Sequence, residues 1–184
     1  IQSDEERGLL DFAIDPDFPA SPYIYVLYTP FSTPNGQRAR VARFTHIENA
    51  GGLPSRGDLN SVNELLLWED SDFYDSCCHF GGGLDFGPDG NLWLTTGEHF
   101  QGSYATNLQK GGGKVHRFTK TGAIPAGNPY ADGAGGNMDS IFAYGMRNPF
   151  RARWDLPSGR FFIGDVGWNT QSVAWEDLHM IRYD

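Results

Sequence analysis

The stretch SCCHFGGGLDFGPDG, residues 76–90, contains two adjacent cysteines, a histidine and, one residue later, three consecutive glycines. Histidine titrates near neutral pH, so His79 can take a proton from a hydroxyl group within hydrogen-bond reach. The glycines remove side chains beside it and would let a flat molecule approach the backbone. A histidine at the entrance to a strand can also be a buried residue with satisfied hydrogen bonds. The stretch therefore indicates either the floor of a catalytic site or a crowded turn.

Two further side chains could serve the same chemistry. Glu98 follows His79 by one strand hairpin, and its carboxylate could bind the far ring nitrogen and fix the tautomer of the imidazole. The alternative for Glu98 is a solvated loop carboxylate. Arg147 carries a planar guanidinium that pairs with acidic ligands, and its alternative is a salt bridge between neighbouring sheets. These residue types favour general-base chemistry beside an anion-binding group.

Cys77 and Cys78 leave three interpretations open. The chain has no second cysteine pair that would complete a soft-metal site. Reduced cysteines would pack as small apolar residues. In an oxidising compartment, the two thiols would form a disulfide with each other and stiffen the turn before His79. In each case the effect of the pair is local.

The composition limits the kind of protein that positions these residues. With 184 residues, of which 39% are hydrophobic and 14% aromatic, the chain can form a globular core. Its 24 glycines and 11 prolines separate short apolar runs, which favours the all-β class. A net charge of −9 disfavours nucleic acid as a partner. No run approaches the roughly 18 apolar residues of a membrane span, and a chain that opens on Ile1 is expected to be processed or a fragment.

An internal similarity indicates the architecture. GLLDFAIDPD (8–17) resembles GGLDFGPDG (82–90), and RVARFT (40–45) resembles KVHRFT (114–119). Both matches have the same spacing of 74 residues, which indicates two related units. We expect strands at about 9–14, 23–29, 38–45 and 63–69, then at about 82–87, 91–97, 113–119 and 139–144. A third unit begins at 150–167, and its second strand is expected at 160–165.

Tandem four-stranded units are typical of a β-propeller, in which blades surround a channel. We predict a partial propeller over 1–184, with blade 1 at about 8–70, blade 2 at about 80–145 and part of blade 3 at about 150–184. Phe12 and Phe86 are expected at equivalent core positions. An open arc would expose two blade faces, so the remainder of the ring is expected in the same or another chain. The alternative, a β-sandwich of about ten strands, gives no reason for a fixed period.

A series of motifs gives the chain a family resemblance. In order, GLLDFAIDPDF, HFGGGLDFGPDGNLWLTTGE, GKVHRF, YGMRNPFRARWD and FIGDVGWN resemble the first half of the glucose/sorbosone dehydrogenase family. The resemblance implies a six-bladed propeller, of which this chain would hold about two and a half blades. It also implies oxidation of a sugar or polyol hydroxyl with pyrroloquinoline quinone (PQQ) and calcium, and an external electron acceptor. The implied location is secreted, periplasmic or at the cell surface.

The resemblance also implies a role for individual residues. His79 would be the general base and Glu98 the acid that orients it, although aspartate is usual at that position. Three residues would contact the quinone from other parts of the chain, namely Glu6, Arg147 and Asn148, with Glu6 standing where the best-known sugar oxidisers have glutamine. The lysine and arginines that complete the family's cofactor site belong to its second half and are not in this chain.

Further implied roles concern calcium and the cysteines. Gly167 and Trp168 would form a turn whose carbonyls bind the calcium that holds PQQ, and Glu176 and Asp177 would belong to a structural calcium site. Asp165 is expected to be a solvated loop carboxylate. The resemblance also favours the disulfide between Cys77 and Cys78.

Fold likeness alone does not decide the activity. The alternative to a dehydrogenase is an extracellular propeller that binds a protein or glycan partner without catalysis. Aromatic loops at 70–76 and 99–105 would suit either function. A third interpretation is a calcium-dependent lactonase on a similar ring.

Overall fold

The computed structural model describes residues 5–30, 38–49, 56–57, 65–70, 77–170 and 173–183. Within them, the first sheet has five strands in which β1, β2, β3 and β5 follow one another as antiparallel neighbours, and β4 pairs with the end of β3. These strands are β1 (Leu9–Ile14), β2 (Tyr23–Tyr28), β3 (Arg40–Ile47), β4 (Arg56–Gly57) and β5 (Leu65–Glu69).

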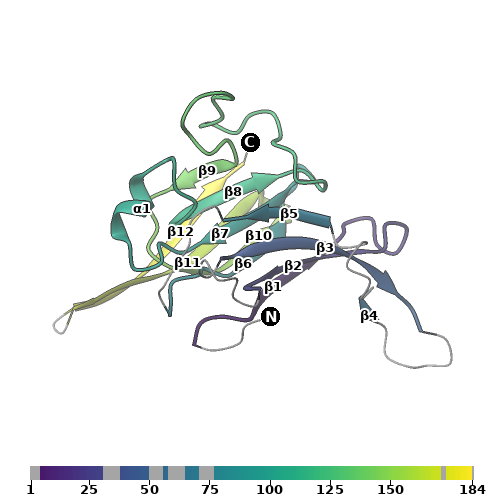
Figure 1. Ribbon diagram of the computed structural model, residues 1–184, viewed down its shortest axis with the longest axis horizontal. Coiled ribbons are helices and arrows are strands. Elements are labelled where there is room, and N and C mark those ends of the chain that lie inside the picture. The colour runs from purple at the N-terminus through teal and green to yellow at the C-terminus, as the bar shows by residue number, and fades with distance from the viewer. Residues whose placement is uncertain are drawn as a thin grey trace.

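The second and third sheets repeat this antiparallel order. The second contains β6 (Gly83–Phe86), β7 (Leu92–Thr96), β8 (Lys114–Phe118) and β9 (Ile141–Tyr144), with the short helix α1 (Gly102–Thr106) between β7 and β8. The third contains β10 (Pro149–Asp155), β11 (Arg160–Thr170) and β12 (Val173–Arg182), and a 3₁₀ turn, η3 (Leu156–Ser158), joins its first two strands. In Figure 1 the first sheet is purple to blue, and β11 and β12 extend to the left as a long hairpin.

The expected strands of the first two units agree with the observed β1–β3, β5 and β6–β9, with bounds that differ by no more than two residues. Strand β11 is longer than expected, because its hairpin with β12 continues beyond Asp165. The short elements β4 and α1 were not expected. No helix among the described residues is long and apolar enough to cross a membrane.

The three sheets meet through their first strands, since β6 packs between β1 and β10. The Asp11 carboxylate makes hydrogen bonds that connect all three sheets. Asp11 of β1 accepts the backbone N–H of Leu84 in β6 at 2.9 Å, and both of its oxygens bind the Arg153 guanidinium of β10. Asp85 acts in the same way one sheet later and accepts the N–H of Trp154 at 2.9 Å. Bidentate and backbone contacts of this kind fix the sheets in register around an axis.

Two apolar cores fill the spaces between the sheets. In the first, Tyr25 and Leu27 of β2 pack with Leu84, Leu92 and Phe118 of the second sheet. The second core is centred on the fully buried Trp93 and includes Val115, Ala152, Trp154, Phe161 and Ile163. Each large side chain buried in this way contributes about 1.5–3 kcal/mol. The cores therefore join neighbouring sheets rather than the two faces of a sandwich.

The prediction of equivalent core positions for Phe12 and Phe86 is wrong for Phe12. Phe86 lies 7% exposed against Tyr25 of the first sheet, with ring centroids 5.0 Å apart. Phe12 is 54% exposed, and Ile14 on the same face of β1 is 51% exposed. Phe86 is covered because a sheet precedes it. In the described part of the chain no sheet packs on the corresponding face of β1.

The glycines after His79 are required by the packing of the sheets. A Cβ atom on Gly81 would lie 2.6 Å from the Thr95 carbonyl oxygen, and one on Gly83 would lie 2.5 Å from the Ala152 side chain. Gly81 also has a φ of +79°, which disfavours any larger residue. Protein atoms fill the space that a side chain would occupy at these positions, so the close packing of neighbouring strands by itself accounts for glycine there.

Candidate active site

His79 and Glu98 form the centre of the site. His79 precedes β6 and Glu98 follows β7, so the pairing of these two strands brings both residues to one rim of the second sheet. The imidazole Nδ1 lies 2.5 Å from Glu98 Oε1, and both side chains are less than one tenth exposed. A carboxylate can only accept in this contact, so Nδ1 carries the proton and Nε2 is the basic nitrogen.

The backbone of His79 is held in an unusual conformation. Its φ is +63°, in the left-handed region, which costs a residue other than glycine about 1–2 kcal/mol. The His79 N–H donates to Glu6 Oε2 at 2.7 Å, and its carbonyl accepts the N–H of His99 at 3.3 Å. Strain of this kind persists only where surrounding contacts enforce it, and it is concentrated at functional sites.

Glu6 and Asn148 brace the same backbone. The Asn148 side chain accepts the Gly81 N–H at 3.1 Å through its oxygen and approaches Glu6 Oε2 to 3.4 Å through its nitrogen. Both side chains are therefore engaged with the segment that carries His79. The structure brings together Glu6, His79 and Asn148, three residues widely separated in the sequence.

Asp165 supports the site from β11, contrary to the expectation of a solvated loop carboxylate. It is 5% exposed, and its two oxygens accept the backbone N–H groups of Arg147 at 3.0 Å and Asn148 at 2.6 Å. The Arg147 carbonyl in turn accepts the Glu98 N–H at 2.8 Å. Sequence reasoning missed this role because the pairing of β10 with β11, which places Asp165 opposite Pro149, was not known.

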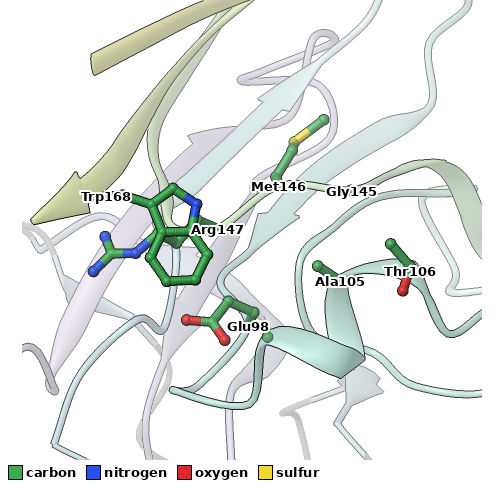
Figure 2. Close-up of a pocket in the computed structure, with 8 residues that line it drawn as sticks. Glu98, Ala105, Thr106, Gly145, Met146, Arg147 and Trp168 are labelled. Atoms are coloured by element: carbon green, nitrogen blue, oxygen red, sulfur yellow. The ribbon is translucent and has the colours of Figure 1, made fainter. Parts of the chain in front are cut away.

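A pocket of about 210 Å³ opens beside Glu98. Figure 2 shows the Glu98 carboxylate, the Arg147 guanidinium and the Trp168 indole on one side and Ala105 and Thr106 of α1 on the other. The guanidinium carbon lies 5.9 Å from the centroid of the Trp168 ring, and Nη1 donates to the Val166 carbonyl at 2.9 Å. The pocket thus presents a cation, an aromatic surface and the carboxylate that binds the histidine.

The four residues expected to bind calcium are arranged differently from the expectation. Gly167 and Trp168 lie within β11 at a register shift between Val166 and Asn169, and not in a turn. Glu176 and Asp177 lie inside β12 and are exposed. The hairpin continues past this bulge, so a turn does not form there. Across the described residues, no three His, Cys, Asp or Glu side chains gather so as to hold a metal ion.

Cys77 and Cys78 are joined to each other by a disulfide in the structure. The Cys77 carbonyl accepts the N–H of Glu6 at 3.4 Å. The linked pair therefore directly precedes His79 and contacts the segment whose carboxylate binds the His79 N–H.

A second histidine and carboxylate lie behind the first pair. His99 Nε2 is 3.7 Å from Asp70 Oδ2, and both side chains are completely inaccessible. Burial lowers the pKa of His99, an effect that the nearby Asp70 partly offsets. His116 is also fully buried: its Nε2 donates to the Gly111 carbonyl at 2.9 Å and its Nδ1 lies 2.9 Å from Ser140 Oγ. Burial lowers the pKa of His116 to about 4.

The antiparallel sheets, which pack on one another through their first strands, have the arrangement of β-propeller blades, and Glu98, the partner of His79, lines a pocket beside them. Residues 1–172 match the family described as Glucose / Sorbosone dehydrogenase, and the chain belongs to this family. The predicted all-β, partial propeller and the family resemblance are both confirmed, since the structural neighbours are propellers of PQQ sugar dehydrogenases.

Individual relatives support the assignment. The chain is 31% identical to the aldose sugar dehydrogenase YliI of Escherichia coli over 78% of its own length and 36% of that protein. It is 29% identical to quinoprotein glucose dehydrogenase B of Acinetobacter calcoaceticus over 91% of its length and 37% of that protein. The PQQ-bound aldose sugar dehydrogenase of Streptomyces coelicolor matches with a TM-score of 0.74 and 26% identity, over 99% of this chain and 48% of that one. The chain thus spans little more than a third of these curated relatives.

Proposed function

We propose that the full-length protein is a quinoprotein oxidoreductase that oxidises a hydroxyl group of a sugar or polyol, with His79 as general base. The observation that carries the proposal is the contact between His79 and Glu98 at the rim of the pocket that Arg147 lines. We also propose that further blades complete the ring, that an external acceptor takes up the electrons, and that the protein is secreted, periplasmic or at the cell surface. The names of the relatives motivate a sugar as the substrate.

The residues of the chain fit an acidic quinone such as PQQ. Arg147 supplies a planar cation inside the pocket, beside the exposed face of Trp168, and such a fork suits carboxylate groups. The described pocket is smaller than the roughly 300–1,000 Å³ of ligand sites, which fits a site that further blades complete. When bound, the quinone would supply the acceptor for the two electrons of the alcohol.

The histidine pair would handle the proton. With Nδ1–H bonded to Glu98, Nε2 of His79 would accept the proton of the substrate hydroxyl, and the carboxylate would stabilise the imidazolium that forms. Glu6 and Asn148 would keep the backbone of His79 in its strained conformation. Their role is to position the base, so their substitution should lower turnover without removing the base itself.

Calcium remains a prediction from the resemblance. Its candidate ligands are Gly167, Trp168, Glu176 and Asp177, and no step is assigned to the ion. Titration of the metal-free protein with calcium, followed by PQQ absorbance, tests whether the ion is needed for cofactor binding.

The proposal is tested by His79→Gln in the full-length protein. This substitution keeps the size and polarity of the side chain but removes the proton acceptor, and we expect turnover of an aldose with an artificial electron acceptor to fall at least about 10²-fold. PQQ affinity, measured by equilibrium titration, should change much less than in Arg147→Ala. A wild-type protein that binds no PQQ and oxidises no aldose would refute the proposal and favour the non-catalytic binding propeller.

A further inference from the structure

Lys114, the first residue of β8, is fully buried. Its Nζ donates to three backbone carbonyls, those of Tyr104 at 2.5 Å, Ala105 at 3.1 Å and Gly112 at 2.6 Å. An ammonium group has three N–H donors, so these contacts use all of them. Removing a charge from water costs free energy, so a lysine is rarely buried unless its charge is engaged in this way. The side chain is therefore held in one place by backbone oxygens.

Two of the three carbonyls belong to α1, the short helix whose Ala105 and Thr106 line the pocket (Figure 2). The helix has five residues, all described, and of these only Ala105 is buried. A helix of this length is not stable by itself, and one buried alanine contributes little apolar packing. The carbonyls of its last turn lack helical partners and interact favourably with a cation. The position of α1 therefore depends on contacts with its neighbours.

The N-terminal end of α1 is held by a turn that precedes the helix. The Gln101 N–H donates to the Glu98 carbonyl at 2.8 Å and closes this turn. Within it, the Phe100 ring stacks on His79 with ring centroids 4.0 Å apart. These contacts keep the Glu98 carboxylate beside His79 whatever happens at the other end of the helix.

The C-terminal end of α1 is held by Lys114 and by the segment that leads to Arg147. The Ala105 carbonyl accepts both the Lys114 ammonium, at 3.1 Å, and the Gly145 N–H, at 2.9 Å. A Cβ atom on Gly113 would lie 2.7 Å from Ala105 Cα, so the chain before β8 passes directly against the helix. Gly145 and Arg147 line the pocket together with α1. Lys114 thus acts where the two walls of the pocket are connected.

The equivalent residue of the first sheet makes different contacts. Arg40 is the first residue of β3, and it stands 74 positions before Lys114, the spacing of the internal similarity. Its guanidinium binds the Glu69 carboxylate, at 2.8 Å through Nε, and its side chain is 27% exposed. A cation at this position therefore forms a partly exposed ion pair in one sheet and a buried contact with a pocket wall in the next.

We propose that Lys114 is a positioning residue for the pocket: its ammonium fixes the C-terminal end of α1, so that Ala105 and Thr106 stand at a set distance from Arg147. This inference rests on the proposed function, in which the pocket takes an acidic quinone, and deepens it. A wall that is already ordered does not have to be ordered by the ligand, which favours binding. Loss of Lys114 should therefore weaken binding and leave the rate of the bound complex nearly unchanged, because the turn at Glu98 still holds the base.

The test is Lys114→Met in the full-length protein, which keeps an unbranched side chain of similar size and removes its donors. Hydrogen exchange without PQQ reports on α1 through two amides, Asn107, which donates to the Tyr104 carbonyl, and Gly145. Both should exchange at least about tenfold faster than in the wild type, while the amides of β7 are unchanged. The PQQ dissociation constant should rise about tenfold, and kcat for D-glucose at saturating PQQ should stay within about threefold.

A matched control is Arg40→Met, which removes the cation at the equivalent position of the first sheet. It should leave the exchange of both reporter amides and the PQQ dissociation constant within about twofold of the wild type. If Lys114→Met does not fold, Lys114→Gln replaces it. The amide keeps two N–H donors but carries no charge, so the same changes are expected in the same direction and smaller.

The outcomes separate the two proposals. Unchanged exchange at Asn107 and Gly145, an equal loss of protection in β7, or a fall in kcat with unchanged PQQ affinity would each overturn the positioning role. If the two amides exchange faster as expected but the wild type binds no PQQ, Lys114 still holds the pocket wall and the quinone proposal fails.

Discussion

The outer pair, His79 and Glu98, and the inner pair, His99 and Asp70, are joined by the adjacent residues Glu98 and His99, and all four residues are buried, yet the two pairs differ in contact distance and in access to a pocket. Glu98 bonds His79 at 2.5 Å beside a pocket, whereas His99 lies 3.7 Å from Asp70 with both side chains inaccessible. In the turn that begins at Glu98, the Glu98 side chain lines the pocket and the next side chain, His99, lies in the interior. A histidine next to a carboxylate therefore does not by itself indicate a catalytic base. Contact distance and access to a pocket distinguish a base from a buried structural group.

Breaking the outer pair, His79 and Glu98, should have the largest effect on turnover. In Glu98→Gln the amide can donate to Nδ1, which favours the tautomer with its proton on Nε2 and removes the base. We expect turnover of D-glucose to fall at least about 10²-fold, while the midpoint of thermal unfolding changes by no more than a few degrees. Steady-state kinetics and a melting curve check both. An unchanged kcat would show that the pair does not act in catalysis.

The buried histidines should instead determine stability at acid pH. His116 has a pKa of about 4 in the folded protein against 6.5 as its ordinary value, because burial disfavours the charged form. The unfolded chain therefore takes up the proton first, and the stabilising contribution present above pH 6.5 is lost as the pH falls toward 4. The loss is about 3 kcal/mol in the free energy of unfolding.

Urea unfolding of the full-length protein between pH 7 and 4 measures this loss. His116→Gln can still bond Ser140 and Gly111 but does not titrate, so its stability should fall less steeply over the same range. Parallel slopes for the variant and the wild type would assign the acid sensitivity to other groups.

Breaking the inner pair, His99 and Asp70, should lower the stability of the fold and leave turnover nearly unchanged. Asp70→Ala removes a fully buried carboxylate next to His99 and leaves a gap beside Gly111, whose Cβ would lie 2.7 Å from that carboxylate. We expect a loss of about 2 kcal/mol in the free energy of unfolding, with kcat within a few fold of the wild type. Denaturant unfolding and steady-state kinetics of one preparation test this. A stable variant with a large loss of turnover would place the inner pair in catalysis.

Sequence alone could predict the strands, the radial sheets and the outer pair, for identifiable physical reasons. Alternating apolar residues mark the strands, and the motifs around His79 and Arg147 mark the site. Other features depend on contacts that no local pattern encodes. Asp165 reaches the site only through the pairing of β10 with β11, and Phe12 is exposed because no sheet of the described residues packs on its face of β1. The bulge at Gly167 likewise follows from the continued pairing of β11 with β12.

The smallest expected effect concerns the turn that separates the two pairs. Phe100→Ala and Phe100→Gly both remove the aromatic ring, but only glycine adopts a φ of +60° without strain. The glycine variant should therefore be more stable than the alanine variant by about 1 kcal/mol, since the left-handed penalty of about 1–2 kcal/mol is partly offset by the flexibility of unfolded glycine. The same two substitutions at Phe162, within the extended strand β11, should give the opposite order, because glycine weakens a strand. Chemical denaturation of the four variants measures both differences. Equal stabilities at Phe100 would show that the turn relaxes once the ring is removed, so that stacking on His79, and not the surrounding fold, maintains the left-handed backbone.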